Sequence, residues 1–195
     1  MNSSLLDLSE YNLARKTLNR SKDDSNDNLH NTDFDNYQFQ AWKTAGSISS
    51  YAATSLLQWN KLKMENDKLS SDFILKDVIS ISADVYDKTR MREHIKKAVK
   101  QYGAVSVSFN VKRTSQIPTY WNPEINKNDW SGHAATIVGW KDDIPVSKFG
   151  NGITQNGGWI VKNSWGTDHG ENGYFYLSYD ADIWDLYSMN FTKRN

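Results

Sequence analysis

Apolar and polar residues repeat with two different periods along the chain. Residues 91–102 place apolar side chains three or four positions apart, with Lys and Arg between them, which predicts an amphipathic helix that Gly103 ends. A similar spacing over residues 48–59 predicts another helix. The period changes to two at residues 105–109, which predicts a strand with one buried face. Three more strands are predicted at 133–140, 159–163 and 173–179.

Helical periods dominate the first half of the chain and strand periods the second half. This order predicts an α+β fold with two lobes. We expect residues 1–100 to belong to a helical lobe, which includes a polar loop at residues 19–40, and residues 101–195 to form a β-rich lobe. A cleft between two such lobes is a natural place for a functional site.

Charge and composition exclude several classes of partner. Lys plus Arg and Asp plus Glu each number 23, so a net charge of zero gives no general attraction to nucleic acid. No apolar run approaches the roughly 20 residues that a membrane span requires, and the first residues do not resemble a secretory signal. The compartment is therefore undetermined. The chain has no Cys, so disulfides, thiolate metal sites and a thiol nucleophile are all excluded.

The four His residues differ in their surroundings. His30 lies in the polar loop, His94 on the polar face of a predicted helix and His169 in a Gly-rich turn, so we expect all three to be ordinary surface residues. His133 instead follows Gly132 at the start of a predicted strand, where a rigid backbone can hold an imidazole at the edge of a cleft. No His pair has the helical spacing of a metal site, so neither a metal nor a cofactor is predicted.

Two long segments resemble motifs of the papain-like cysteine peptidases. Residues 159–167, which read Trp-Ile-Val-Lys-Asn-Ser-Trp-Gly-Thr, and residues 170–175 resemble the segment that carries the catalytic Asn of that family. Residues 132–134, followed by the apolar run 137–140, resemble the segment that carries its catalytic His. The stretch 8–13 resembles a segment that comes after the family's catalytic helix, so the resemblance covers most of the chain.

This resemblance implies a fold, an activity and a set of site residues. The fold would be papain-like, with a helical lobe and an antiparallel β-barrel-like lobe, and the substrate would be a peptide or protein. His133 would be the general base and acid, and Asn163 would orient its ring. Trp165 would shield the His–Asn hydrogen bond from water. Gly46 and Gly132 would contact the substrate.

The nucleophile of such a site is missing. In papain-type enzymes the His lies roughly 130 to 150 residues after the Cys, which places the Cys at about position 3 or before the first residue of this chain. An alternative alignment sets Ala41 at the Cys position, but the interval to His133 is then too short by tens of residues. Ser3 and Ser4 are weaker candidates, because neither has a recognisable oxyanion partner.

We therefore expect a C-terminal portion of a papain-like peptidase whose helical lobe lacks the catalytic helix. Such a chain would be inactive alone and would need an N-terminal fragment bearing the Cys. The alternative is a non-catalytic module of the same fold, which binds peptides or is complemented by a partner. The polar segment 141–156 resembles a longer loop of some bacterial members, and intact members of the family are typically secreted or surface-associated.

Overall fold

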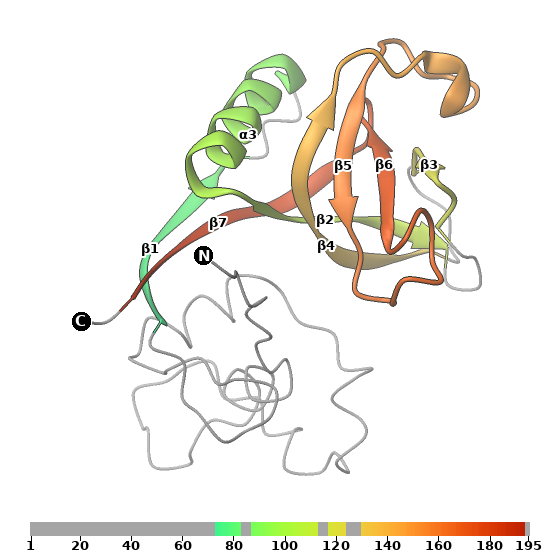
Figure 1. Cartoon of the computed structure of the whole chain (residues 1–195). Helices are drawn as coiled ribbons and strands as arrows, with labels where there is room; N and C mark the ends of the chain where they lie inside the picture. Colours follow the sequence, from blue (N-terminus) through green and yellow to red (C-terminus); the bar gives the residue numbers. More distant parts are fainter. Residues whose placement is uncertain (1–72, 83–86, 113–116, 124–129, 194–195) are drawn as a thin grey trace. The chain divides into compact units, whose positions relative to one another are not determined.

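The computed structural model describes residues 73–82, 87–112, 117–123 and 130–193 (Figure 1). Within these ranges it contains one α-helix, one short 3-10 turn and seven strands. In chain order these are β1 (Phe73–Ile81), α3 (Lys88–Tyr102), β2 (Val105–Lys112), β3 (Tyr120–Trp121), β4 (Trp130–Lys141), η3 (Val146–Lys148), β5 (Gly158–Lys162), β6 (Tyr174–Ser178) and β7 (Ile183–Lys193). The predicted α+β class is confirmed.

Helix α3 ends where the sequence predicts, at Tyr102, and begins at Lys88, three residues before the predicted stretch. The Asp87 side chain caps its start by accepting a hydrogen bond from the Arg90 backbone N–H at 2.8 Å. Gly103, with φ of 90°, ends it and donates its N–H to the Val99 carbonyl at 2.9 Å. The buried side chains fall on one face, at Met91, Ile95, Ala98 and Val99.

The seven strands form one sheet in the order β1-β7-β2-β4-β5-β6-β3. The pairs that join β7, β2, β4, β5 and β6 are antiparallel, and β3 lies parallel to β6. The order is linear, so the predicted barrel-like lobe is an open sheet in the described part of the chain. At the centre of this sheet Phe109 of β2 is opposite His133 of β4 on one side and Ile183 of β7 on the other.

Four strands match the sequence prediction closely and three were not predicted. The predicted strand at 105–109 extends to 112 in β2, and the one at 133–140 extends at both ends in β4. Strands β5 and β6 agree with prediction to within one residue at each end. The unpredicted strands are β1, β3 and β7.

The core lies where α3 packs against the sheet. Its fully buried side chains alternate along β2 and β5, as expected for strands with one covered face. The largest of them are Trp159, Phe109, Phe175, Ile95, Ile137 and Leu177. Burying such large apolar side chains is the main favourable term for folding this unit.

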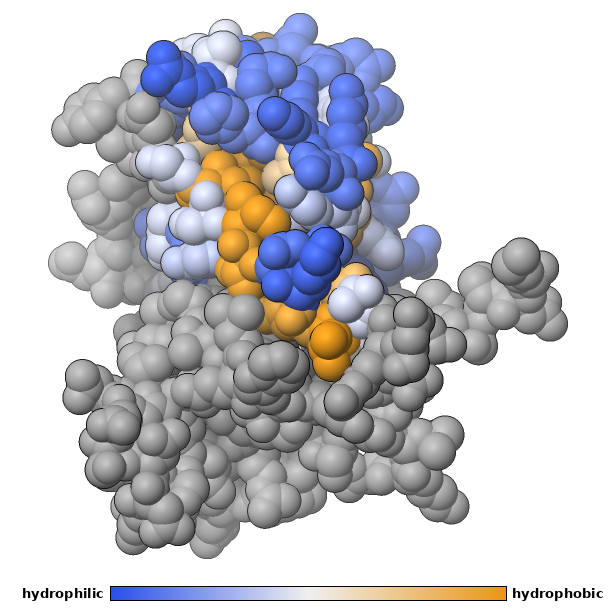
Figure 2. Space-filling model, turned by 90° about the vertical axis from the view of Figure 1, so that its left-hand side faces the viewer, coloured by the Kyte–Doolittle hydropathy of each residue, from blue (hydrophilic) through white to orange (hydrophobic). Residues whose placement is uncertain are grey.

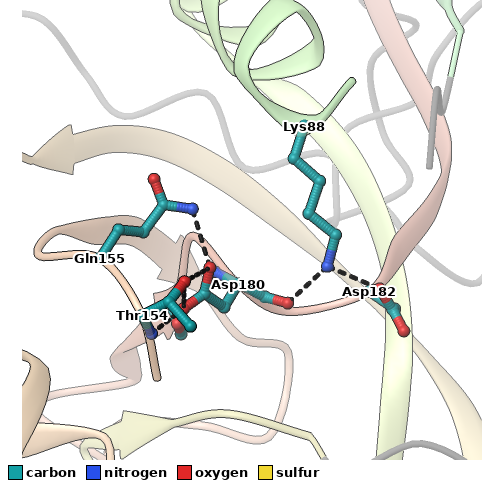
Figure 3. A network of polar contacts seen from close by, with 6 residues as sticks. Lys88, Thr154, Gln155, Asp180 and Asp182 are labelled. Carbon is teal, nitrogen blue, oxygen red and sulfur yellow. Dashed lines mark hydrogen bonds and ion pairs between the residues drawn. The ribbon is translucent and has the colours of Figure 1, made fainter. Parts of the chain in front are cut away.

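A polar network fixes the turn between β6 and β7 (Figure 3). The Asp180 carboxylate accepts hydrogen bonds from the Thr154 backbone N–H at 2.5 Å and from the Gln155 side-chain amide at 2.8 Å. Lys88, at the start of α3, donates to the Asp180 backbone carbonyl and to the Asp182 carboxylate, both at 2.7 Å. Burial raises the pKa of Asp180, but the hydrogen bonds from Thr154 and Gln155 together outweigh it and lower the pKa overall.

A second polar cluster lies between α3 and the sheet. The Asp142 carboxylate accepts hydrogen bonds from Lys96 at 2.7 Å and from the Tyr179 hydroxyl at 2.8 Å. Arg92 lies 5.0 Å from the centroid of the Tyr179 ring. The hydrogen bond from Lys96 is the main reason why the pKa of Asp142 is lowered, whereas burial and then Asp142 raise the pKa of Tyr179.

The chain divides into two compact units. The first contains residues 1–78 and 190–195, and the second contains residues 79–189. In the first unit the structure describes 73–78 and 190–193, where the Asn190 side-chain amide donates to the Asp77 carboxylate at 3.4 Å. The second unit holds α3 and most of the sheet. The predicted polar loop at 19–40, the predicted helix at 48–59 and Gly46 lie outside the described residues.

Candidate active site

Neighbouring strands bring His133 and Asn163 together from positions 30 residues apart. His133 is the fourth residue of β4, and Asn163 directly follows the last residue of β5. These strands are antiparallel neighbours, with Thr136 opposite Lys162. The two side chains meet with 2.8 Å between His133 Nε2 and Asn163 Oδ1. The pair that the sequence singled out is therefore in hydrogen-bonding contact.

A second contact of Asn163 determines which nitrogen of His133 carries the proton. Asn163 Oδ1 also accepts the backbone N–H of Ser164 at 2.9 Å. A backbone N–H can only donate, so the atom that faces it is the amide oxygen and not the amide nitrogen. The same oxygen can only accept from the ring, so His133 Nε2 must carry a hydrogen. In the neutral imidazole, Nδ1 is then the basic nitrogen.

Two aromatic rings pack against the imidazole. Phe109 meets His133 edge-on, with ring centroids 5.5 Å apart, and the Trp165 centroid is 4.5 Å away at an interplanar angle of 43°. Burial lowers the pKa of His133 because the charged form loses hydration, and the hydrogen bond to Asn163 opposes this effect. His133 is therefore held mainly in its neutral form at pH 7. The contact with Phe109 was not anticipated from the sequence.

The backbone after β5 holds Asn163 in place. Asn163 is 9% exposed, and its N–H donates to the Gly173 carbonyl at 2.9 Å. The turn needs glycine at Gly170, where φ is 60° and a Cβ atom would lie 2.2 Å from the Tyr174 carbonyl oxygen. The backbone of Asn163 is thus held by Gly173, and its side-chain oxygen by the Ser164 N–H.

His169 is more buried than its place in a Gly-rich turn suggests. Its exposure is intermediate, and its ring lies edge-on to Trp165 with centroids 5.6 Å apart. His169 Nδ1 is buried and has no hydrogen-bond partner among the described residues. The expectation of an ordinary solvated His169 is therefore wrong. The sequence signal that it lies close to Trp165 was only their spacing of four residues.

The remaining candidate residues have simpler surroundings. Gly132 is exposed on β4, and an added Cβ would meet only the Trp184 ring, at an ordinary 3.6 Å. His94 is exposed on α3, as expected, and His30 lies outside the described residues. In the described ranges no group of three or more His, Asp or Glu side chains could hold a metal ion. None of the helices described there is long and apolar enough to cross a membrane.

An imidazole bonded to a neutral amide, on neighbouring strands of an α+β fold, is the arrangement expected in cysteine peptidases of the Cys-His-Asn type. The chain belongs to the papain family of cysteine proteases, whose family model matches residues 3–192. The Cys that names this family is absent from all 195 residues.

Curated relatives support the family assignment over parts of the chain. A viral cathepsin of Cydia pomonella granulosis virus is 27% identical over 145 residues, which are 71% of this chain and 40% of the relative. Procathepsin L of Felis catus is 32% identical over 79 residues, which are 40% of this chain and 22% of the relative. The chain thus spans less than half the length of these relatives.

Solved structures match over nearly the whole chain. The cysteine protease and lectin-like domains of Cwp84, a surface layer associated protein of Clostridium difficile, match with a TM-score of 0.69 and 25% identity, over 97% of this chain and 42% of that one. Cwp84 after propeptide cleavage matches with the same score and identity, over 97% and 48%. The SERA5 proenzyme of Plasmodium falciparum, at 13% identity and a TM-score of 0.57, shares the fold alone.

Proposed function

We propose that this chain supplies the His and Asn of a papain-like endopeptidase to a Cys that lies outside its sequence. The observation that carries the proposal is the 2.8 Å contact between His133 Nε2 and Asn163 Oδ1, in a family member without any Cys. The contact leaves Nδ1 as the basic nitrogen for a thiol. The cathepsin relatives and Cwp84 support peptides as the substrate class.

The chemistry in the complemented site begins with a proton transfer. His133 Nδ1 takes the proton of the supplied thiol, which gives a thiolate and an imidazolium. The thiolate attacks the peptide carbonyl carbon and forms an S–C bond. The C–N bond then breaks as Nδ1–H returns its proton to the leaving amine. Water, deprotonated by Nδ1, hydrolyses the thioester and regenerates the thiol.

Asn163 and Trp165 have positioning roles in this scheme. Asn163 keeps the Nε2 proton engaged throughout, so that only Nδ1 exchanges protons with the reacting groups. A neutral amide does this without adding a negative charge beside the imidazolium. Trp165 covers the imidazole and limits access of water to the His–Asn hydrogen bond. Gly132 and Gly46 are proposed substrate contacts.

The remainder of the parent fold follows from the same proposal. Residues 1–100 would complete part of a helical lobe, and residues 101–195 would carry the His and Asn segments. The segment 141–156, which contains η3, would be the longer loop of bacterial members of the family. The Cys and its helix would come from an N-terminal fragment.

A complementation assay tests the proposal. The chain alone should not cleave a fluorogenic peptide, whereas mixing it with a polypeptide that carries the Cys-bearing catalytic helix of a papain-family member should produce cleavage. A Cys→Ala form of that polypeptide is the control and should restore nothing. Cleavage by the chain alone, or cleavage that survives His133→Ala, would contradict the proposal.

The absence of Cys favours one alternative function. The same fold would bind peptides beside His133 without cleaving them, as a non-catalytic module. Peptide binding with no gain of cleavage on complementation would support this alternative. Binding that becomes turnover when the Cys is supplied would support the peptidase.

A further inference from the structure

Asn is followed by Gly at three positions of the sequence, which all lie in the described ranges: Asn151–Gly152, Asn156–Gly157 and Asn172–Gly173. This dipeptide is chemically labile, because the backbone nitrogen of the glycine can attack the side-chain amide carbon of the Asn, and glycine has no side chain to hinder the attack. The reaction converts Asn to aspartate or isoaspartate and adds a negative charge. How readily it occurs depends on how the fold holds each pair.

Hydrogen bonds and packing protect two of the pairs. The Gly157 N–H donates to the Ile144 carbonyl at 2.8 Å, and the Gly173 N–H donates to the His169 carbonyl at 2.9 Å. Both glycines are buried. The Asn156 side chain in addition accepts the backbone N–H of the first residue of η3 at 3.1 Å. A backbone amide that is bonded in this way must first be freed by local opening before its nitrogen can react.

The third pair lies open in the loop between β4 and β5. Asn151 and Gly152 are both exposed, and no hydrogen bond in the described part of the chain engages the Asn151 side chain or the Gly152 N–H. Gly150 and Gly152 have φ of 95° and 82°, and a Cβ atom added at either would meet nothing within 4 Å. A Cβ atom added at Gly157 would instead lie 2.4 Å from the Tyr179 ring. The fold therefore leaves Asn151 with both an accessible nucleophile and space to react.

Helix α3 fixes both ends of this loop. Lys96 donates a hydrogen bond to Asp142 at 2.7 Å, and Arg92 donates one to the Gln155 side chain. Figure 2 shows a mainly hydrophilic surface above a strip of hydrophobic residues on the side of the molecule where Figure 1 shows α3. With its ends held, the loop keeps its middle, at residues 150–153, away from the packed core.

We propose that the fold selects Asn151 as the site of spontaneous deamidation among the three pairs. Hydroxide removes the Gly152 N–H proton, the nitrogen forms a bond to Asn151 Cγ, and the C–N bond of the side-chain amide breaks as ammonia leaves. Water then opens the resulting succinimide to aspartate or isoaspartate. Water is the only co-reactant. The proposal does not depend on the peptidase chemistry, because neither residue belongs to the His133 site.

Ageing of the full chain in mildly alkaline buffer tests the proposal. Tandem mass spectrometry of its peptides should show that Asn151 reacts about tenfold or more faster than Asn156 and Asn172, which must wait for local opening. In a urea-unfolded sample the three rates should agree to within about threefold, because no structure then protects any N–H. Equal rates in the folded chain would overturn the proposal. A preference for Asn151 that is just as strong in urea would overturn it too, because the sequence and not the fold would then set it.

Two variants isolate the contribution of Asn151. The formal net charge of the chain is zero, so deamidation makes it negative by one unit and isoelectric focusing separates the product. Asn151→Gln should abolish the early charge shift, because the longer side chain reacts far more slowly by this route. Asn156→Gln is the matched control in the same loop and should leave the shift unchanged. An early shift that persists in Asn151→Gln would contradict the assignment.

Discussion

Two polar regions of the sheet differ in what their ionisable groups are free to do. In the turn network, Asp180 accepts hydrogen bonds from Thr154 and Gln155, and the adjacent carbonyl is bonded to Lys88. Around His133, one ring nitrogen is fixed by Asn163 and the other is left as an available base. The first region uses its polar groups to fasten elements together. The second keeps one polar atom available.

This difference distinguishes a structural polar cluster from a candidate catalytic one. Both regions shift pKa values, so a shifted pKa alone does not separate them. The separating feature is geometry. Hydrogen bonds hold Asp180 in its charged form, whereas burial holds His133 neutral and one contact sets its tautomer. Variants of the two regions should therefore affect different properties.

The largest expected effect is on activity in the complemented enzyme. Replacing His133 with Ala should lower kcat/KM by about 10²- to 10⁴-fold, because general acid–base catalysis is lost. His94→Ala, an exposed imidazole on α3, should leave kcat/KM within about twofold. Equal losses of kcat/KM in the two variants would contradict a catalytic role for His133.

The turn network should respond in stability instead. Asp180→Ala leaves the Thr154 and Gln155 donors without their acceptor and should cost about 1–3 kcal/mol of unfolding free energy in urea denaturation. Asp143 lies in an exposed turn, so Asp143→Ala should change the free energy of unfolding by no more than about 0.5 kcal/mol. Complemented activity, corrected for the folded fraction, should be unchanged in both variants. A selective loss of kcat in Asp180→Ala would contradict a purely structural role for the turn network.

As the pH falls, His133 should lower the free energy of unfolding at a higher pH than Asp180 does. The pKa of His133 is lower in the folded chain, so the unfolded chain binds a proton more readily and stability falls as pH drops below about 6.5. The lowered pKa of Asp180 adds a separate loss that begins only below about pH 5. Urea denaturation from pH 7.5 to 4 should show both steps. His133→Gln should remove the first step alone, and an unchanged first step would contradict the assignment.

Trp165 and Asn163 should shift the pKa of His133 in opposite directions. Trp165→Ala admits water to the imidazole and should raise the pKa, whereas Asn163→Leu keeps the burial, removes the hydrogen bond and should lower it. Phe191 lies on β7 and its ring is about as exposed as that of Trp165. Phe191→Ala should leave the pKa of His133 unchanged. NMR titration of the ring protons measures all three. Shifts of the same sign would contradict the opposite effects of the two contacts on the pKa of His133.

Local periodicity was sufficient for α3 and for the strands that carry the site. The apolar spacing of α3 and its stop at Gly103 were predicted, whereas its capped start at Asp87 was not, and β4 and β5 have regular apolar runs. Strand β7 escaped prediction because its alternation is broken. Asp185 has a positive φ of 54°, and the register with β2 shifts there, so Ile183 and Leu186 are both buried although three residues apart.

The site itself was predictable only in part. His133 and Asn163 were found through motif resemblance, because 30 intervening residues give no local signal that the side chains meet. The packing of Phe109 against His133 depends on the pairing of β2 with β4, which is a long-range register. The half-buried state of His169 depends on the path of the turn after β5. Such tertiary contacts are not encoded in the period of a single segment.

The tautomer of His133 tests the central claim most directly. Nitrogen-15 NMR of the full chain at pH 7.5 reports which ring nitrogen carries the proton. The contact with the Asn163 amide oxygen requires a protonated Nε2 and an unprotonated Nδ1. That pattern, lost in Asn163→Leu, is the result we predict. A ring protonated at Nδ1 would contradict the account, because the basic nitrogen would then be Nε2, which faces Asn163, and Nδ1 could not accept the proton of a thiol.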